Sequence, residues 1–453
     1  MGFFKAYDMR GTFGIDFDLG LVRRIGRALP RIVKGRRWLV GRDCRVTGSD
    51  MTSALVAGLS EAGAEVVDIG LATTPMVYFF TAQDGYDGSV MVTASHNPPS
   101  DNGLKVSMRT ALPVGYANGL DEVERLALAD SGDIAQSVGV VSKASDPVAL
   151  ERYVAWQREA TDDASFSGLR YAVDCSNGMA SLLVRKLFPD AVVINDNLDG
   201  RFPAHSPNPL KAEAREQIAA IVREKGLDCG IIFDGDADRA MFVDEHGGFV
   251  QPDYLIPVIA CATLAVRGAS GVERPVVLHD VRTSRGAIEA LREHGFEPSM
   301  VQVGHAFAKP AMRERGALCG GELAGHYYFA EFFGCDSGVL AARRVLSEVA
   351  LAKSRGETFS QMMRPLVSRY ANSGEMNFRV EDKDAAIARV LAAASSFGTE
   401  IGRSEMDGVR LEFSDGWVNV RKSNTEPYLR LIVERRGDIA QWTDVLKEAI
   451  DAR

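Results

Sequence analysis

The chain has 453 residues, which is too long for one ordinary hydrophobic core and predicts several domains. It is 46% apolar and 25% charged, a mixture typical of globular proteins, and its net charge of −9 argues against non-specific binding of nucleic acid. That charge does not exclude an anionic substrate, because a few converging Arg and Lys side chains set the local field.

Cysteine usage and hydropathy point to an intracellular protein. The six cysteines are scattered singly and form no CxxC pair, a pattern typical of reduced thiols rather than of a disulfide framework or a zinc site. The start, MGFFKAYDMR, lacks the apolar core of a signal peptide. The longest apolar stretch, near residues 255–266, contains a proline and falls short of the ~20 residues of a membrane span. We therefore expect a cytoplasmic protein that binds neither membranes nor nucleic acid.

Residues 1–145 are predicted to form a first α/β domain, and the segment MVTASHNP at 91–98 is its central feature. An apolar run reads as a buried strand, and Asn-Pro reads as the turn that ends it. This arrangement places the hydroxyl of Ser95 on a loop at the carboxyl end of a strand, where open α/β sheets bind their ligands. Taken alone, Ser95 could equally be a turn residue or a helix N-cap. Strands are also expected at 37–40 and 65–69.

Residues 146–246 and 247–360 are predicted to form two further α/β domains. Each repeats the pattern of an apolar strand, a polar loop with glycine and then a helix. Strands are expected at 171–174, 229–233 and 300–303, and a helix at 212–225. The strand at 229–233 leads to DGDADR, and a segment at 318–321 leads to GELAGH. Three such units suggest one architecture used three times, with the loops facing one cleft.

Residues 361–453 have the sequence pattern of an α+β domain. Stretches at 376–380, 409–413, 416–420 and 428–433 alternate like antiparallel strands, and 382–396 and 439–449 read as helices. One strand pair encloses RKSNTEP at 421–427. We expect hinge motion near residues 360–370 when a ligand binds.

Asp234, Asp236 and Asp238 place three carboxylates at alternate positions, and hard divalent cations such as Mg²⁺ prefer such oxygen ligands. A calcium EF-hand is the main rival, since Glu245 falls at loop position 12. That reading fails at position 6, where Arg239 replaces the required glycine, and the flanking segments resemble strands. We therefore predict a metal site.

Two further loops carry polar side chains suited to a sugar phosphate. The segment from Arg421 to Thr425 offers a guanidinium, a lysine, two hydroxyls and an amide, which together suit an anion, although a plain polar hairpin loop is an equal alternative. Glu322 and His326 flank a glycine and are suited to bind vicinal hydroxyls or relay a proton. Taken alone, this segment is better explained as a loop with incidental polar residues.

The chain lacks the GxSxG elbow of an α/β-hydrolase and the GxxxxGK[ST] loop of a nucleotide-binding protein. Ser95 therefore needs another electrophile. Three aspartates with a metal ion point to phosphoryl transfer.

In this order, TASHNP with DNGLK, DGDADR, GELAGH and RKSNTEP closely resemble the motifs of the α-D-phosphohexomutase family, which includes phosphomannomutase, phosphoglucomutase and phosphoglucosamine mutase. YDMRG near the start and GHAFAK at 304–309 also match, so the resemblance covers essentially the whole chain. It implies a heart-shaped protein with three similar α/β domains and a C-terminal α+β domain around a cleft.

The resemblance also implies roles for individual residues. Ser95 would be the phosphoserine and would bind Mg²⁺ together with Asp234, Asp236 and Asp238. Glu322 and His326 would hold sugar hydroxyls. The phosphate that is not reacting would be gripped by Arg421, Ser423, Asn424 and Thr425. Supporting positions are Tyr7, Arg10, His96, Lys105, Arg239, Arg282 and His305.

Two positions depart from the family pattern. Ala324 stands where the sugar loop usually has Ser, and Arg282 stands where many members have Lys. The first removes or replaces one sugar contact, and the second keeps the positive charge but changes the donor geometry. The stretch from His326 to Phe329 favours the phosphomannomutase/phosphoglucomutase branch.

The reaction implied is the interconversion of hexose 1-phosphate and 6-phosphate, of mannose or glucose, with a hexose 1,6-bisphosphate as intermediate and activator. Lys105, Arg10 and His326 are the candidates that activate the attacking hydroxyl, and the sequence does not rank them. One alternative is a phosphoglucosamine mutase, and another is a catalytically silent sugar-phosphate binding protein. We expect a monomer or a weak homodimer.

Overall fold

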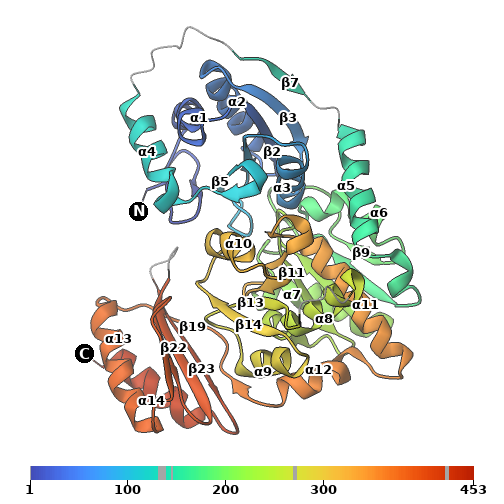
Figure 1. Cartoon of the computed structure of the whole chain (residues 1–453), viewed down its shortest axis with the longest axis vertical. Helices are drawn as coiled ribbons and strands as arrows, with labels where there is room; N and C mark the ends of the chain where they lie inside the picture. Colours follow the sequence, from blue (N-terminus) through green and yellow to red (C-terminus); the bar gives the residue numbers. More distant parts are fainter. Residues whose placement is uncertain (1, 131–138, 144–145, 269–272, 424–427, 453) are drawn as a thin grey trace.

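The structure is a computed structural model that describes residues 2–130, 139–143, 146–268, 273–423 and 428–452. The described chain forms four sheets in succession, which Figure 1 shows from the blue N-terminal domain to the red C-terminal domain. Three are mixed sheets with helices between their strands and the fourth is antiparallel, so the predicted class of three α/β domains and one α+β domain is confirmed. The domain boundaries drawn from the sequence stay predictions.

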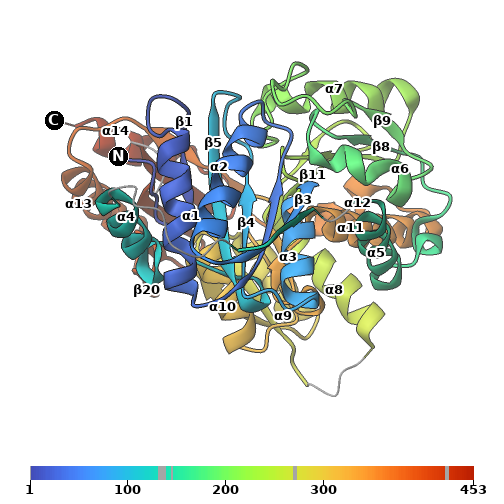
Figure 2. The same cartoon turned by 90° about the horizontal axis from the view of Figure 1, so that it is seen from above.

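The first sheet has the order β1-β5-β4-β2-β3-β7, with β6 paired to β5. Side chains of successive strand residues point to opposite faces, so Leu39 and Met91 pack in the core that contains α3, whereas Val40 and Val90 pack in the core under α1 and α2. Helices α1 and α2 lie side by side on that second face (Figure 2). The elements of this domain are β1 (Met9–Thr12), α1 (Leu19–Val33), β2 (Arg37–Arg42), α2 (Gly48–Glu61), β3 (Glu65–Leu71), α3 (Thr74–Gln83), β4 (Gly88–Val92), β5 (Asp101–Met108), β6 (Leu112–Pro113), α4 (Leu120–Ala129) and β7 (Val141–Lys143).

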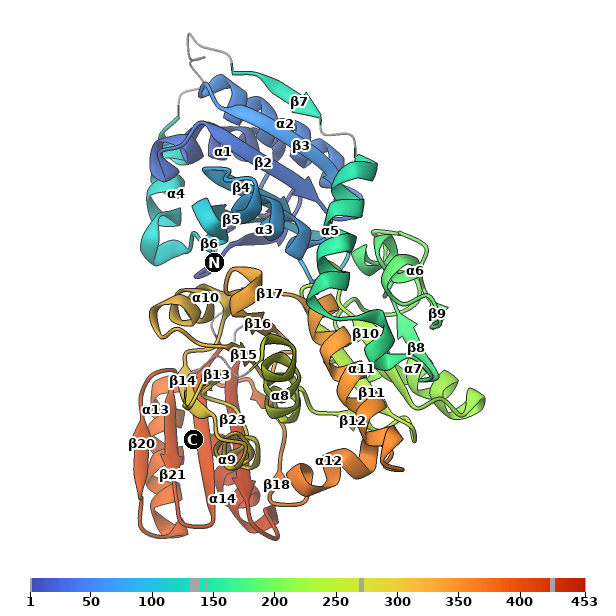
Figure 3. The same ribbon diagram turned by 45° about the vertical axis from the view of Figure 1, so that its right-hand side comes forward.

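The second sheet has the order β12-β11-β10-β8-β9. Figure 3 shows that α5 runs from the first sheet toward α6 and α11, so this helix connects the first two domains. The elements are α5 (Asp146–Ala160), β8 (Tyr171–Asp174), α6 (Val184–Leu187), β9 (Val192–Ile194), α7 (Ala212–Lys225), β10 (Cys229–Phe233), β11 (Ala240–Asp244) and β12 (Phe249–Val250).

The third sheet has the order β14-β13-β15-β16-β17. Its elements are α8 (Leu255–Arg267), β13 (Val276–Asp280), α9 (Arg285–Glu293), β14 (Glu297–Val301), α10 (His305–Glu314), β15 (Cys319–Gly321), β16 (Tyr327–Phe329), β17 (Cys335–Asp336), α11 (Gly338–Ser354) and α12 (Phe359–Val367).

One connection recurs in all three α/β domains. In each, a strand that pairs in parallel with its neighbour on one side is followed by a strand antiparallel to it: β4 by β5, β10 by β11 and β15 by β16. The three connecting loops carry Ser95, the aspartate triplet and the segment from Glu322 to His326. The expected threefold use of one architecture is therefore confirmed, down to the loop that carries the polar residues.

The fourth domain has a core of its own. Its sheet has the order β18-β23-β22-β21-β20, with β19 paired to β23, and helices α13 and α14 pack on it. One apolar cluster instead extends through the first three domains, each of which also has a smaller cluster of its own. A small cluster of Leu323, Trp417 and Ile432 joins the third domain to the fourth. The elements are β18 (Ala371–Asn372), β19 (Met376–Phe378), α13 (Lys383–Ala394), β20 (Gly402–Ser404), β21 (Val409–Glu412), β22 (Gly416–Lys422), β23 (Leu429–Arg435) and α14 (Ala440–Asp451).

Two further expectations meet the structure here. All six cysteines are free thiols. Among the described residues, the helices are either too short or too polar to cross a membrane.

Candidate active site

Ser95 lies just after β4, in the connection to β5. Its φ of 51° falls in the left-handed region, which costs a non-glycine residue about 1–2 kcal/mol. The Ser95 N–H donates to Oγ1 of Thr93 at 2.8 Å, and its carbonyl accepts from Arg45 at 2.8 Å. These contacts stabilise the strained turn. The Ser95 hydroxyl itself donates to Oδ2 of Asp234 at 2.9 Å, so the predicted nucleophile meets the predicted acid triplet.

Arg45 is a structural residue of this site that the sequence analysis missed. Its buried guanidinium pairs with Asp43 at 3.2 Å. It also donates to four backbone carbonyls around the serine loop, those of Ser95, Asn97, Pro98 and Asp101. One planar donor group therefore fixes the whole loop.

The aspartate triplet is buried, and it fits a cation. One ligand oxygen from each of Asp234, Asp236 and Asp238 lies within 4.8 Å of the others. Oδ1 of Asp236 and Oδ1 of Asp238 are buried and have no hydrogen-bond partner among the described residues, which is costly unless a cation binds them. Burial and then the charges of Asp238 and Asp236 raise the pKa of Asp234 well above its usual value. The triplet could therefore bind a metal ion.

The serine loop and the acid loop approach each other closely at Gly235. A Cβ atom on Gly235 would lie 2.6 Å from the carbonyl oxygen of Ser95, so only glycine fits this position without a shift. The requirement for glycine in the sequence DGDADR thus comes from packing between two domains.

Lys105 and Arg10 bring positive charge to the triplet from the first domain. Nζ of Lys105, on β5, lies 2.7 Å from Oδ2 of Asp236 and also pairs with Asp238. Burial would lower the pKa of Lys105, but Asp236 and Asp238 outweigh burial and hold it above the usual range. Arg10 pairs with Asp8 at 2.7 Å, and its pKa is likewise raised, because burial is outweighed first by Asp8 and then by Asp236. Both predicted cations therefore lie beside the loop that carries the aspartate triplet.

Three predicted aromatic residues lie around the same centre. Nδ1 of His96 lies 3.3 Å from the Ser95 hydroxyl, and burial, then Arg239 and Arg10, lower its pKa well below the usual value. His305 is buried, and burial followed by Lys309 lowers its pKa in the same way. The rings of Tyr7 and His305 meet edge to face at 6.3 Å. Both histidines are therefore neutral near pH 7.

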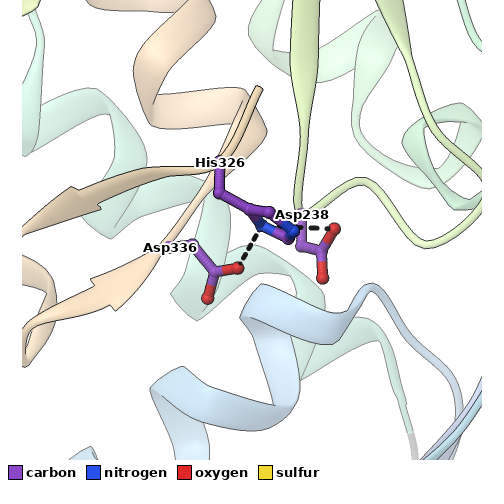
Figure 4. A group of neighbouring side chains, drawn as sticks. All are labelled: Asp238, His326 and Asp336. Carbon is purple, nitrogen blue, oxygen red and sulfur yellow. Dashed lines mark hydrogen bonds and ion pairs between the residues drawn. The ribbon is translucent and has the colours of Figure 1, made fainter. Parts of the chain in front are cut away.

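His326 is held between Arg239 and Asp336. Figure 4 shows the ring with its two acidic neighbours, Asp238 and Asp336. Nε of Arg239 donates to its Nε2 at 2.9 Å, and its Nδ1 lies 2.7 Å from Oδ2 of Asp336. Because an arginine N–H only donates, Nε2 is the acceptor and Nδ1 carries the proton. A backbone bridge between Arg239 and His326 joins the acid loop to the sugar loop. Asp238 lies farther away, at 3.9 Å from Nδ1.

Asp336 and Lys309 were not predicted as site residues. Nζ of Lys309 lies 2.8 Å from Oδ1 of Asp336 and 3.4 Å from the ring centroid of Tyr78. The segment GHAFAK, which was singled out for its resemblance to the family, ends at this lysine, so the sequence did carry a signal for it. Asp336 is placed by β17, whose pairing to β16 is short and hard to anticipate.

The predicted sugar-binding residues Glu322 and Arg282 lie together. Glu322 accepts a hydrogen bond from the Tyr328 hydroxyl, and burial raises its pKa above the usual value. Nη2 of Arg282 lies 2.6 Å from Oδ2 of Asp280 and 3.7 Å from Oε2 of Glu322. Nη1 of Arg282 reaches Glu375 at 3.4 Å. A lysine could not contact three carboxylates with this planar geometry, so the departure at position 282 has a structural consequence.

The predicted phosphate-binding loop is described in part. Arg421 is the last residue but one of β22 and is buried, and its Nη2 lies 2.9 Å from Oε2 of Glu375. Ser423 is also buried. The predicted residues Asn424 and Thr425 lie outside the described residues. Glu375 is a further member that the sequence analysis missed.

Comparisons with known proteins show the family of the chain. Four family models for phosphoglucomutase/phosphomannomutase match in order: the alpha/beta/alpha domains I, II and III at residues 1–130, 151–248 and 251–370, and the C-terminal domain at 375–452. The chain is 36% identical over 442 residues to phosphohexose mutases of Xanthomonas campestris pv. campestris, covering 96% of each chain. It is 35% identical over 457 residues to a phosphomannomutase of Salmonella montevideo, covering 99% of this chain and 98% of that one.

A solved structure gives the same answer. The chain superposes with a TM-score of 0.86 on a phosphoglucomutase/phosphomannomutase family protein from Burkholderia thailandensis, which is 30% identical, and the match covers 99% of this chain and 97% of that chain. The chain belongs to the phosphoglucomutase/phosphomannomutase family of α-D-phosphohexomutases and is a phosphohexomutase, an isomerase of carbohydrate metabolism.

Proposed function

We propose that Ser95 carries the phosphoryl group in the interconversion of hexose 1-phosphate and hexose 6-phosphate. The observation that carries this proposal is the 2.9 Å hydrogen bond from the Ser95 hydroxyl to Asp234. In the part of the chain that the structure describes, two buried oxygens of the same triplet lack a hydrogen-bond partner. A hydroxyl nucleophile beside an acid cluster that can hold a metal ion suits phosphoryl transfer.

Mg²⁺ is the ion we propose for the triplet, held by Asp234, Asp236, Asp238 and an oxygen of the phosphorylated Ser95. When bound, such an ion offsets the negative charge of the transferring phosphoryl group. The chain's own cations, Lys105 and Arg10, carry positive charge to the same place.

The proposed step transfers phosphorus from one oxygen to another. A hydroxyl of the hexose monophosphate attacks the phosphorus, a sugar O–P bond forms, and the bond from Oγ of Ser95 to phosphorus breaks. Lys105, Arg10 and His326 are the candidates that polarise or deprotonate the attacking hydroxyl. The raised pKa values of Lys105 and Arg10 keep both side chains protonated, so they can polarise the hydroxyl, and His326 is the candidate that takes its proton. His326 has its acceptor nitrogen bonded to Arg239 here, so it can take the proton only after that hydrogen bond opens.

The resulting hexose 1,6-bisphosphate then reverses its orientation in the cleft and returns its other phosphate to Ser95. We propose that Arg421, Ser423, Asn424 and Thr425 grip the phosphate that is not reacting, and that Glu322 and His326 bind sugar hydroxyls. Tyr7, His96, Arg239, Arg282 and His305 support the substrate. A hexose 1,6-bisphosphate is the proposed activator, because it phosphorylates Ser95 in an unphosphorylated enzyme.

The preferred sugar is proposed to be mannose or glucose. This proposal is supported by the relatives named phosphomannomutase. It is also supported by the stretch from His326 to Phe329, which resembles the phosphomannomutase/phosphoglucomutase branch. An N-acetylphosphoglucosamine mutase of Aspergillus fumigatus was solved with GlcNAc-6P and magnesium, but that protein is 15% identical and shares only the fold. We also propose a cytoplasmic location and a monomer or weak homodimer.

Turnover of a sugar panel tests this proposal. Mannose 1-phosphate, glucose 1-phosphate and glucosamine 1-phosphate are compared with a trace of glucose 1,6-bisphosphate as primer. We expect the highest kcat/KM for mannose or glucose 1-phosphate. Preference for glucosamine 1-phosphate would identify a phosphoglucosamine mutase, and no turnover with tight binding would identify a silent sugar-phosphate binding protein.

A further inference from the structure

Glu375 lies in the segment between β18 and β19, where the chain enters the fourth domain, and it contacts three arginines. Oε2 lies 2.9 Å from Nη2 of Arg421 and 3.4 Å from Nη1 of Arg282. Oε1 lies 3.0 Å from Nη1 of Arg430. The carboxylate side chain is only 18% exposed, so solvent screens these contacts weakly. One carboxylate therefore joins an arginine of the third domain to two of the fourth.

The charges explain why this carboxylate is needed. Arg421 is buried, and burial followed by the like charge of Arg282 lowers its pKa below the usual value. Burial alone would raise the pKa of Glu375, but Arg282, Arg421 and Arg430 outweigh it and hold that pKa at about 2. Glu375 is therefore an anion at every physiological pH. It offsets the repulsion between guanidinium groups that come from two different domains.

Glu375 is also the main anchor of the Arg421 guanidinium. Asp407 is the other carboxylate near it, but its Oδ2 lies 3.9 Å from Nη1 of Arg421. Nε of Arg421 is buried and has no hydrogen-bond partner among the described residues. Apart from the bond to Glu375, little in the described part of the chain fixes the plane of this side chain. A planar guanidinium binds phosphate well only when its plane is correctly oriented.

We propose that Glu375 is a positioning residue for substrate phosphate: it holds Arg421 and Arg282 at a fixed spacing, so that the two arginines meet the phosphosugar together. This inference rests on the proposed function of Arg421 as a phosphate-binding residue. It assigns to Glu375 no contact with the reacting phosphoryl group, which lies at the serine loop.

The proposed role of Glu375 in positioning Arg421 differs from a general role in joining the third and fourth domains, which other contacts also join. Glu412 pairs with Arg285 of α9 and with Arg410 at 2.7 Å. Arg410 donates to the carbonyl oxygens of Val281 at 2.6 Å and of Thr283 at 3.0 Å. Glu412 thus makes an ion pair between the same two domains without contacting Arg421, and E412Q is the matched control.

The test measures kcat and KM for the phosphosugar, and the Kd of inorganic phosphate, in E375Q, E375D, E412Q and R421K. For E375Q we expect KM and the phosphate Kd to rise about tenfold, with kcat changed less than about threefold, because substrate binding and not the chemical step is affected. E375D keeps the charge and should fall between wild type and E375Q. E412Q should keep the wild-type KM. In E375Q/R421K the effects should be less than additive, because the two residues act as one unit.

The outcomes separate the inference from its premise. If R421K raises KM while E375Q leaves KM and the phosphate Kd unchanged, Glu375 does not position Arg421. If E375Q lowers KM and the phosphate Kd, Glu375 competes with phosphate for the arginines, and this result also overturns the proposal. If R421K itself keeps the wild-type KM, the phosphate-binding role of Arg421 fails and the inference fails with it. Should E375Q not fold, E375D decides by the same criteria.

Discussion

The ammonium group of Lys105 lies 2.7 Å from the carboxylate of Asp236, so a lysine of the first domain offsets part of the negative charge of the acid triplet in the second. It pairs with Asp238 as well, and both partners are buried. In a buried setting such an ion pair is strong, and each partner is costly without the other. The lysine therefore has two effects, since it stabilises the contact between the two domains and reduces the negative charge available to a metal ion.

Replacing Lys105 by methionine should tighten metal binding while it impairs catalysis. K105M removes a competing positive charge a few ångströms from the triplet, so the Kd of Mg²⁺ should fall at least about tenfold. Turnover should fall as well, because Lys105 is proposed to act on the substrate. Isothermal titration with Mg²⁺ measures the first effect. K353M is the control, since Lys353 pairs with Asp228 at 2.7 Å on the surface. An unchanged or weaker Mg²⁺ affinity in K105M would contradict this account.

The Asp336 carboxylate sets the proton position on His326. D336N keeps the shape and a hydrogen-bond acceptor but loses the charge that faces both His326 and Lys309. We expect kcat to fall about 10–100-fold with a smaller change in KM, the range that is typical when the carboxylate partner of a metal-binding histidine is changed. Steady-state kinetics with the preferred phosphosugar test this. A D336N enzyme with wild-type kcat would show that the orientation of His326 does not depend on this charge.

The buried carboxyl of Asp253 should make stability fall as the pH rises. It accepts hydrogen bonds from the Ser284 N–H at 2.7 Å and from Gln251 at 2.9 Å, and burial raises its pKa from 3.8 to about 7. Between these two pH values the folded state holds a proton that the unfolded state has lost, so the free energy of unfolding decreases with rising pH in this window. The full effect, reached above pH 7, is about 4 kcal/mol.

D253N removes this titration. Its amide oxygen can still accept from Ser284, and the Gln251 amide can turn over to pair with the new NH₂ group. The difference in denaturation midpoint between D253N and wild type should therefore grow in favour of D253N from pH 4 to pH 8. A difference that stays constant over this range would show that Asp253 titrates normally.

The strand and loop pattern of the sequence predicted most of the architecture. The expected ranges 171–174, 212–225 and 229–233 coincide with β8, α7 and β10, because their apolar periodicity agrees with their burial in the sheet. The polar loops lie at strand ends as expected, since each one reverses the chain between a strand and the antiparallel strand that follows it in the same sheet.

Two strands were misjudged, each because tertiary pairing decides them. No strand was expected at Asp101–Met108, which begins with Asp, Asn and Gly, yet this segment forms β5, which pairs with β1 and β4. A strand was expected at 300–303, but β14 ends at Val301, where its parallel pairing with β13 ends at Asp280. Gln302 and Val303 instead make hydrogen bonds to Met406 and Asp407 of the fourth domain.

The site residues that the sequence missed act through other residues. Arg45, Asp336 and Glu375 hold the serine loop, His326 and Arg421, each from another part of the chain. Motif spacing cannot identify such partners, because their contacts span sequence separations set only by the fold. Residues such as Ser95 and the aspartate triplet stand out because their own chemistry is unusual at that spacing.

The identity of the phosphoryl carrier is the central claim, and intact mass spectrometry of the protein tests it most directly. After incubation with glucose 1,6-bisphosphate and Mg²⁺, the wild-type chain should carry one phosphate, and peptide mapping should place it on Ser95. S95A should stay unmodified and lose essentially all turnover while it keeps its fold. Phosphate on another residue, or near-normal mutase activity in S95A, would contradict the account.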